Sequence, residues 1–198
     1  FDQNLNMCKN CGHIQLSKFV SPELLYNNIY ANRTSESYLS DNAIKYFKNF
    51  LLKTLKRKKN EGILEIGCND IKLINNLKDN FKILYGIDPI WKKRKTPSTK
   101  RIKVIGDYVE RVNLNKINSK INAVVSTHNL EHIDDPYKVL KRFLNKLDKD
   151  TIFFIEVPDA DLMVKNCRFD QVFHQHYHYF NLNLKIFDFA YRHIITFI

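Results

Sequence analysis

Apolar positions recur with two different periods along the chain, and the change of period divides it in two. Between residues 36 and 58 the apolar side chains lie three or four positions apart, behind Ser37 and Ser40 as possible caps and ahead of a run of cations. From residue 62 onward, short apolar runs alternate with amphipathic segments. The first pattern predicts one amphipathic helix, whose buried face holds Ala43, Ile44, Phe47, Phe50, Leu51 and Leu55.

The alternating part of the chain predicts an α/β fold, a parallel sheet with helices on both faces. Beyond it, residues 181–198 predict a further helix and a sixth strand. The five earlier strands are predicted at 63–67, 82–88, 102–106, 121–127 and 151–157, with helices at 71–80 and 135–148.

Size and charge narrow the class of protein. With 198 residues, 44% hydrophobic and 13% aromatic, the chain can bury the core of one main domain. The net charge of +11 comes from short clusters such as "KTLKRKKN" and "WKKRK", which favours a lysine-rich surface and no nucleic-acid partner. A nucleic-acid binder remains the alternative. Because no apolar run approaches the roughly 18 residues of a membrane span and no signal peptide opens the chain, we expect no membrane contact and a cytoplasmic location.

The cysteines indicate a reduced compartment and half of a metal site. Cys8 and Cys11 stand at CxxC spacing, whereas the other two cysteines are isolated. A structural zinc ion takes four ligands, usually from two such pairs. We therefore expect residues 1–35 to be part of a zinc-binding region whose other cysteines lie upstream of Phe1, with a metal-free turn as the alternative. Residues 36–198 form the second predicted domain.

Acidic residues and a glycine stand at three predicted strand ends, where ligands bind in such sheets. Glu65 and Gly67 end the first strand, Asp88 ends the second and Asp107 ends the third. The glycine allows the backbone to approach a ligand, Asp88 can accept hydrogen bonds from ribose hydroxyls, and Asp107 can accept one from an adenine amine. A single glycine without GxGxxG favours a nucleoside that lacks a pyrophosphate. S-adenosylmethionine (SAM) fits this site.

The segment "FDQVFHQHYHYF", residues 169–180, concentrates three histidines among aromatic side chains. If the segment is extended, His174, His176 and His178 share one face, because side chains two apart point the same way. Such a face is a metal site, a general base with its helpers, or an aromatic wall with incidental histidines. We favour a general base at His176.

Several motifs together resemble a known family of enzymes. The stretches "ILEIGCND", "YGIDP", "STHNLEHIDDP" and "FIEVPD" look like successive motifs of class I SAM-dependent methyltransferases. The knuckle "CKNCGHIQL", with "SPELLYNNIYANRTSES" and the histidine segment, resembles sugar methyltransferases that carry an N-terminal zinc-binding domain. The resemblance implies a Rossmann-like sheet, SAM and zinc as cofactors, and a sugar or nucleotide-linked sugar as substrate in sugar or polysaccharide biosynthesis.

The resemblance also implies roles for individual residues. SAM would be held by residues from the strand ends and from the loop after the fourth strand, while the cysteine pair forms half of the zinc site. A tyrosine and two histidines would face the sugar, with His176 as the base. The implied residues are Glu65, Gly67, Asp88, Asp107, His128 and Asn129 for SAM, Cys8 and Cys11 for zinc, and Tyr30, His132 and His176 for catalysis.

The chain departs from the family pattern in three places. Phe173 and Gln175 replace a tyrosine and a glutamate beside the base, which favours oxygen over carbon as the methyl acceptor and leaves both open. Glycines are missing after Asp70 and Asp150. No seventh strand or C-terminal domain follows, so we expect that domain to be absent. These departures keep a degenerate methyltransferase scaffold as an alternative function.

Overall fold

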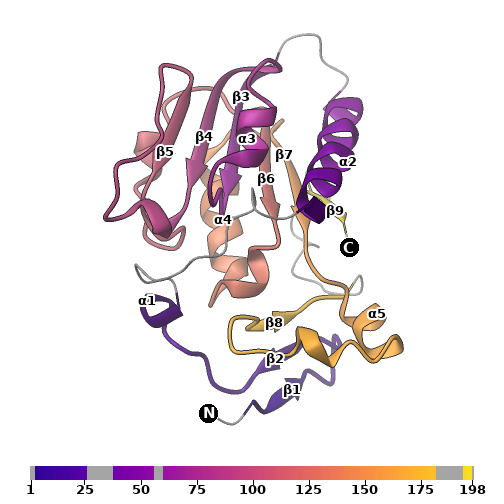
Figure 1. Cartoon of the computed structure of the whole chain (residues 1–198). Helices are drawn as coiled ribbons and strands as arrows, with labels where there is room; N and C mark the ends of the chain where they lie inside the picture. The colour runs from indigo at the N-terminus through magenta and orange to yellow at the C-terminus, as the bar shows by residue number, and fades with distance from the viewer. Residues whose placement is uncertain (1–2, 26–37, 56–59, 182–193, 198) are drawn as a thin grey trace.

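The structure is a computed structural model that describes residues 3–25, 38–55, 60–181 and 194–197. Two sheets organise it, a large parallel one and a small antiparallel one that lies below it in Figure 1. Within the described residues, no helix is both long and apolar enough to cross a membrane.

The large sheet has six parallel strands, and their order reverses at its centre. The chain runs outward from β3 to β4 and β5, and then returns to the other side of β3 with β6 and β7. This reversal places a topological switch point between β3 and β6, where ligands of open α/β sheets bind. Across the sheet the strands are β5 (Ile102–Ile105), β4 (Phe81–Ile87), β3 (Asn60–Ile66), β6 (Ala123–Thr127), β7 (Ile152–Glu156) and β9 (Ile194–Phe197).

Helices cover both faces of this sheet, as the sequence predicted (Figure 1). Successive residues of β3 point to opposite faces. Ile63 therefore packs with α2 (Tyr38–Leu55) and α3 (Lys72–Asn76), and Leu64 packs with α4 (Pro136–Lys146). The five predicted core strands and the predicted N-terminal helix are confirmed within the described residues.

The helix α3 is shorter than predicted, and its start is strained. It begins after Ile71, whose φ of 62° lies in the left-handed region. An L-residue in that region costs about 1–2 kcal/mol relative to the right-handed one. The missing glycine after Asp70 therefore leaves an isoleucine in a conformation that suits glycine.

The small sheet pairs strands near the N-terminus with β8, so both predicted domains contribute strands to it. Their division remains a prediction. Two short helices, α1 and α5, lie beside this sheet in Figure 1. The strands β1 (Leu5–Met7), β2 (Ile14–Leu16) and β8 (His178–Tyr179) pair antiparallel in that order, and the helices span Pro22–Leu25 (α1) and Ala160–Lys165 (α5).

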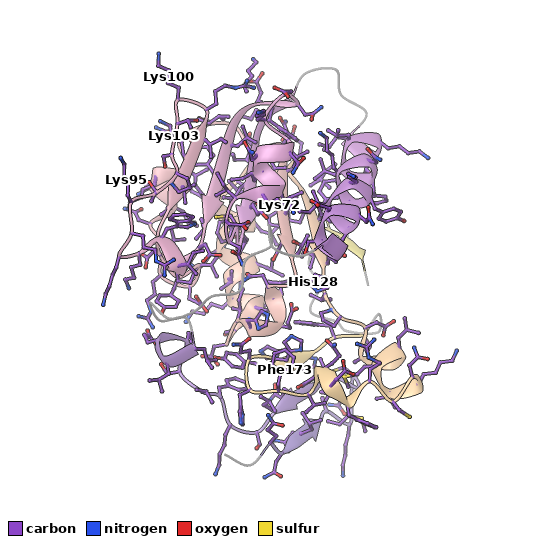
Figure 2. All side chains as sticks on the ribbon, in the orientation of Figure 1. Lys72, Lys95, Lys100, Lys103, His128 and Phe173 are labelled. Carbon is purple, nitrogen blue, oxygen red and sulfur yellow. The ribbon has the colours of Figure 1, made fainter. Side chains whose placement is uncertain are left out.

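Lysines occupy the exposed edge of the large sheet. Figure 2 shows Lys95, Lys100 and Lys103 extending away from the sheet around β5, its edge strand. Charged side chains on an edge strand oppose pairing with the edge of another molecule. Part of the net charge of +11 therefore has a structural explanation.

Candidate functional site

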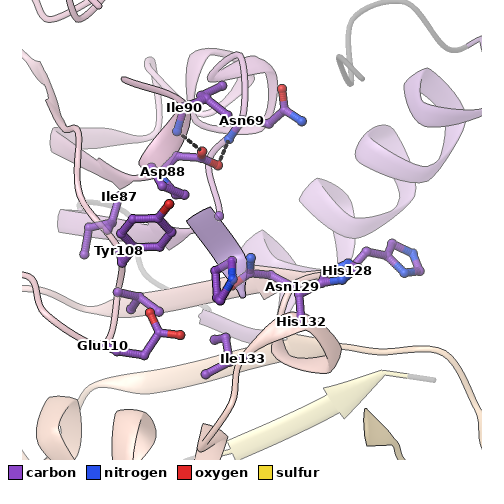
Figure 3. A pocket seen from close by; sticks show the side chains of 14 residues that line it. Asn69, Ile87, Asp88, Ile90, Tyr108, Glu110, His128, Asn129, His132 and Ile133 are labelled. Atoms are coloured by element: carbon purple, nitrogen blue, oxygen red, sulfur yellow. Dashed lines mark hydrogen bonds between the residues drawn. The ribbon is translucent and has the colours of Figure 1, made fainter. Parts of the chain in front are cut away.

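An open cavity of about 690 Å³ lies beyond the carboxyl ends of the central strands, where the sequence placed the ligand site (Figure 3). It is bounded by the loops that follow β3, β4, β5 and β6. Its lining includes Gly67, Asn69, Asp88, Tyr108, Glu110, His128, Asn129 and His132.

Asp88 follows β4 directly and connects two of these loops. Its Oδ2 accepts a hydrogen bond from the backbone N–H of Asn69 at 2.8 Å, and its Oδ1 accepts one from that of Ile90 at 2.9 Å (Figure 3). The second bond caps the short 3₁₀ helix Pro89–Trp91. A carboxylate offers about four lone-pair positions, so it retains capacity to accept from the hydroxyls of a ligand.

Gly67 allows the loop after β3 to lie against the loop after β6. Its φ is 76°, and a Cβ built on it would lie 2.5 Å from Nδ2 of Asn129. Glycine alone satisfies both this conformation and this close approach. The structure thus brings together two residues that the sequence had assigned to SAM.

Asp107 does not line this cavity, although the residue after it does. Its Oδ1 accepts a hydrogen bond from the Tyr108 N–H at 2.9 Å and lies 3.7 Å from Lys92 Nζ. Tyr108 lines the cavity instead, with Lys92 Nζ 5.0 Å from its ring centroid. Sequence reasoning missed Tyr108, and the available signal was an aromatic residue directly after the acidic strand end.

Glu65 lines a second open cavity, of about 890 Å³, between α2 and the strand ends. Both cavities share Gly67, Asn69 and His128. Glu65 is 4% exposed, and its Oε2 has no hydrogen-bond partner among the described residues. Burial raises the pKa of this carboxyl to about 8. A buried carboxyl with one oxygen that lacks a partner, at a cavity wall, is suited to receive a cationic group.

The predicted catalytic histidines, His132 and His176, lie side by side. His132 ends the 3₁₀ helix Leu130–His132, and its Nδ1–H donates to the backbone carbonyl of Gln175 at 2.7 Å. The ring centroids of the two histidines are 5.0 Å apart. His132 lines the first cavity, and the buried His176 packs against it and against Phe173. Burial lowers the pKa of His176 to about 4.

His128 lies at the junction of the two cavities with an unusual backbone. Its φ is 47°, and its Nδ1 and Nε2 lie 3.7 Å from Glu131 Oε1 and 3.8 Å from Glu156 Oε1. The contact with Glu131 raises the pKa of His128. In Figure 3 its ring points away from Asp88 and Tyr108, so it borders the site without facing these two residues.

The histidine segment is not extended, so its three imidazoles do not share one face. Residues 169–171 form a 3₁₀ helix, and a turn follows in which the His176 N–H donates to the Phe173 carbonyl at 3.0 Å. Only the last part of the segment, β8, is a strand, and there His178 Nδ1 lies 3.0 Å from His13 Nε2. The condition for a metal site on a strand face is therefore not met.

Tyr30, the third predicted catalytic residue, lies outside the described residues. The chain is described up to Leu25 and again from Tyr38. Just before the undescribed part, Pro22 at the start of α1 lines the first cavity. The role of Tyr30 therefore remains a prediction.

Cys8 and Cys11 lie in the tight connection between β1 and β2. The Cys8 N–H donates to the His13 carbonyl at 2.8 Å, and the Gly12 N–H donates to the Cys8 carbonyl at 2.9 Å. Backbone N–H groups of Asn10 and Cys11 lower the pKa of the Cys8 thiol, which favours the thiolate that binds metal. This arrangement fits one half of a tetrahedral zinc site.

Comparisons with known proteins agree with the fold. A family described as "Methyltransferase domain" matches residues 37–185. The C-methyltransferase NovU of Streptomyces niveus is 43% identical over 51 residues, which cover 26% of this chain and 12% of that protein. The match thus spans a small part of the curated relative's length.

Two solved structures share the fold at low sequence identity. The plantazolicin methyltransferase BpumL, solved in complex with SAH, has a TM-score of 0.53 at 16% identity, and the comparison covers 73% of this chain and 59% of that one. The YcgJ protein of Bacillus subtilis has a TM-score of 0.53 at 12% identity, with 70% and 63% of the two chains covered.

Proposed function

This chain belongs to the methyltransferase domain family, and on that premise we propose that it transfers a methyl group from SAM to a nucleotide-linked sugar. The observation that carries the proposal is the adjacency of two sets of residues. Gly67 and Asp88, suited to a nucleoside, line the same cavity as His132, which packs against His176. A methyl donor and a proton acceptor would therefore meet at one place.

The described residues fit SAM in charge as well as in shape. Asp88 can accept from ribose hydroxyls, and the Tyr108 ring offers a flat surface to an adenine. Glu65, buried at the wall of the adjoining cavity with its Oε2 unsatisfied, would meet the ammonium group of the methionine part. When bound, SAM supplies an electrophilic methyl group on a sulfonium.

His176 would act as the general base. As the acceptor atom of the sugar attacks the methyl group, its proton passes to an imidazole nitrogen, and the carbon–sulfur electron pair remains on sulfur. The half-buried ring of Phe173 and the buried ring of Tyr179 pack against His176 and would exclude water from this transfer. Because burial holds the pKa of His176 at about 4, its imidazole is neutral and able to accept a proton at pH 7.

Two assays test the proposal and separate oxygen from carbon as the acceptor. Transfer of labelled methyl from SAM to a panel of nucleotide-linked sugars should give a labelled sugar product, whereas a degenerate scaffold would bind SAM and give none. For the acceptor, sugars incubated with the protein in deuterated water exchange a carbon-bound hydrogen only if a carbanion forms. We favour an oxygen acceptor because Phe173 lacks the phenol and Gln175 lacks the carboxylate that would orient or charge His176 for removing a proton from carbon.

Binding of SAM should release a proton. Glu65, with a pKa raised to about 8, holds a proton at pH 7 in the free protein, and a nearby ammonium group favours its ionised form. The affinity for SAM should therefore increase as the pH rises toward about 8. Calorimetry in buffers of different ionisation enthalpy measures the released proton. Glu65→Gln should abolish the release, and proton uptake by the unmodified protein would contradict the assignment.

The intact protein should contain about one zinc ion per chain, held in part by Cys8 and Cys11. The double variant Cys8→Ser/Cys11→Ser should lose this zinc, while Cys167→Ser, also an exposed cysteine, should retain it. The affinity for SAM should stay nearly constant, because the SAM-assigned residues lie at the large sheet. Metal analysis checks the first expectation and calorimetry the second; zinc that persists in the double variant would place the ion elsewhere.

A further inference from the structure

A buried carboxylate without hydrogen-bond donors lies directly behind the predicted catalytic histidines. Glu131 is 1% exposed, and neither of its carboxylate oxygens has a hydrogen-bond partner among the described residues. A buried ionised carboxylate is costly unless a positive charge or a donor compensates it. Nothing in the proposed binding of SAM uses this residue.

Three imidazoles surround Glu131. Its Oε1 lies 3.7 Å from His128 Nδ1 and 3.9 Å from His132 Nε2. One nitrogen each from His132 and His176 and one carboxylate oxygen of Glu131 all lie within 4.8 Å of one another. His176 also faces Tyr179 from β8, and the side chains whose charge acts on its pKa are Glu131, His132 and His128.

The hydrogen bonding of His132 explains why this histidine does not donate a hydrogen bond to Glu131. The Nδ1–H of His132 is committed to the carbonyl of Gln175, because a carbonyl can only accept. With the hydrogen on Nδ1, the Nε2 of an imidazole has none to donate to Glu131 Oε1, which lies 3.9 Å away. The carboxylate gains a donor on this side only when a proton arrives at the histidine pair.

We propose that Glu131 is a positioning residue that stabilises the imidazolium formed when the His132–His176 pair takes the proton of the acceptor group. This inference rests on the proposed methyl transfer. The family that this chain resembles has a glutamate at the position of Gln175, which is uncharged here. Glu131 would supply the negative charge that Gln175 lacks. Glu131 reaches the pair from the 3₁₀ helix Leu130–His132 instead of from the histidine segment.

The step balances in protons and charge. The covalent bond between the methyl-accepting atom of the sugar and its hydrogen breaks. Its electron pair forms the bond to the methyl carbon, and the proton binds a ring nitrogen of the histidine pair. The sulfonium loses its positive charge as the imidazolium gains one, so the total charge is unchanged. Glu131 stays ionised throughout and pairs with the imidazolium only after the transfer.

Nuclear magnetic resonance on the free protein tests the inference without any sugar. In Glu131→Gln, removal of the negative charge should lower the pKa of His176 by about one pH unit, because an opposite charge at this range favours the protonated form. Glu61→Gln removes a carboxylate that pairs with Lys82 on the surface and should leave His176 unchanged. An unaltered His176 titration in Glu131→Gln overturns the proposal, whatever the protein methylates.

Turnover provides the second test. Glu131→Gln should lower kcat by about 10- to 10³-fold with little change in KM or SAM affinity, and Glu131→Asp, which keeps the charge, should recover part of the loss. A loss of thermal stability with normal kcat would mean a purely structural carboxylate and overturn the proposal. If the histidine titration shifts as expected but no sugar is methylated, the proposed function fails and the electrostatic coupling stands.

A metal ion is the competing explanation for one carboxylate and two imidazoles at this spacing. Chelation followed by metal analysis distinguishes the two. In Cys8→Ser/Cys11→Ser, which lacks the knuckle cysteines, activity that survives chelation supports a proton-stabilising Glu131. Activity that is lost on chelation and restored by zinc or manganese would overturn it.

Discussion

The substitution His176→Ala should lower kcat by about 10²- to 10⁴-fold, the usual contribution of a general base. The affinity for SAM should stay nearly constant, because His176 lines neither of the cavities that contain Glu65, Gly67 and Asp88. Single-turnover assays with labelled SAM measure the chemical step, and calorimetry measures binding.

The neighbouring His174 provides a matched control for His176. It belongs to the same aromatic segment and is only half-buried, so His174→Ala should leave kcat within about threefold of the parent protein. The acid limb of the pH profile is a further check. Because burial lowers the pKa of His176 to about 4, activity should persist well below pH 6.5 and fall only near pH 4. Normal turnover in His176→Ala would contradict the general-base assignment and mean that residues 169–180 form only a packed aromatic surface.

Gly67→Ala should weaken SAM binding by about 10²-fold or more. A left-handed conformation costs an alanine about 1–2 kcal/mol, and the new Cβ would also stand 2.5 Å from Nδ2 and 2.9 Å from Cβ of Asn129. The loops after β3 and β6 must separate to relieve this contact. Since both loops line the nucleoside cavity, the change alters the site itself as well as stability, and calorimetry with SAM measures the first effect.

A second variant separates the steric part of this effect from the backbone part. Asn129→Gly removes the three atoms nearest to the new Cβ, which all belong to the Asn129 side chain, so Gly67→Ala/Asn129→Gly should recover part of the lost SAM affinity. Gly12→Ala is the matched control, because Gly12 has a φ of 71° but lies in the connection between β1 and β2. Equal losses in all three variants would mean that general destabilisation, and not the loop contact, weakens binding.

The sequence predicted the parallel sheet well because its strands are short apolar runs between clear helical segments. Glu65, Gly67 and Asp88 could be placed for the same reason, since each directly ends or follows a strand and the fold gathers strand ends at one edge. The order of the strands makes that edge a ligand site whatever the side chains are.

Other features depend on pairings that no local pattern contains. The histidine segment alternates in sequence, yet only β8 is extended, because β2 offers a partner only to its end. In the sequence, Glu131 is one residue of the motif "STHNLEHIDDP" and carries no further signal. Its surroundings depend on imidazole rings up to 45 positions away in the chain, such as that of His176. Asp107 was the residue predicted from the end of β5, and the direction of the following loop brings Tyr108 to the cavity in its place.

The pairing of β2 with β8 also fixes an order for synthesis of the chain. Ile14 in β2 pairs with Tyr179 in β8, and the Leu16 N–H donates to the carbonyl of Tyr177 at 2.9 Å. During translation the hairpin of β1 and β2, which carries Cys8 and Cys11, leaves the ribosome early. It can pair with β8 only after most of the chain has been made. At about 5–20 residues per second that interval lasts on the order of ten seconds or more. If the hairpin binds the proposed zinc ion, metal supply during synthesis would therefore influence when β8 docks and when the proposed catalytic histidines reach their places.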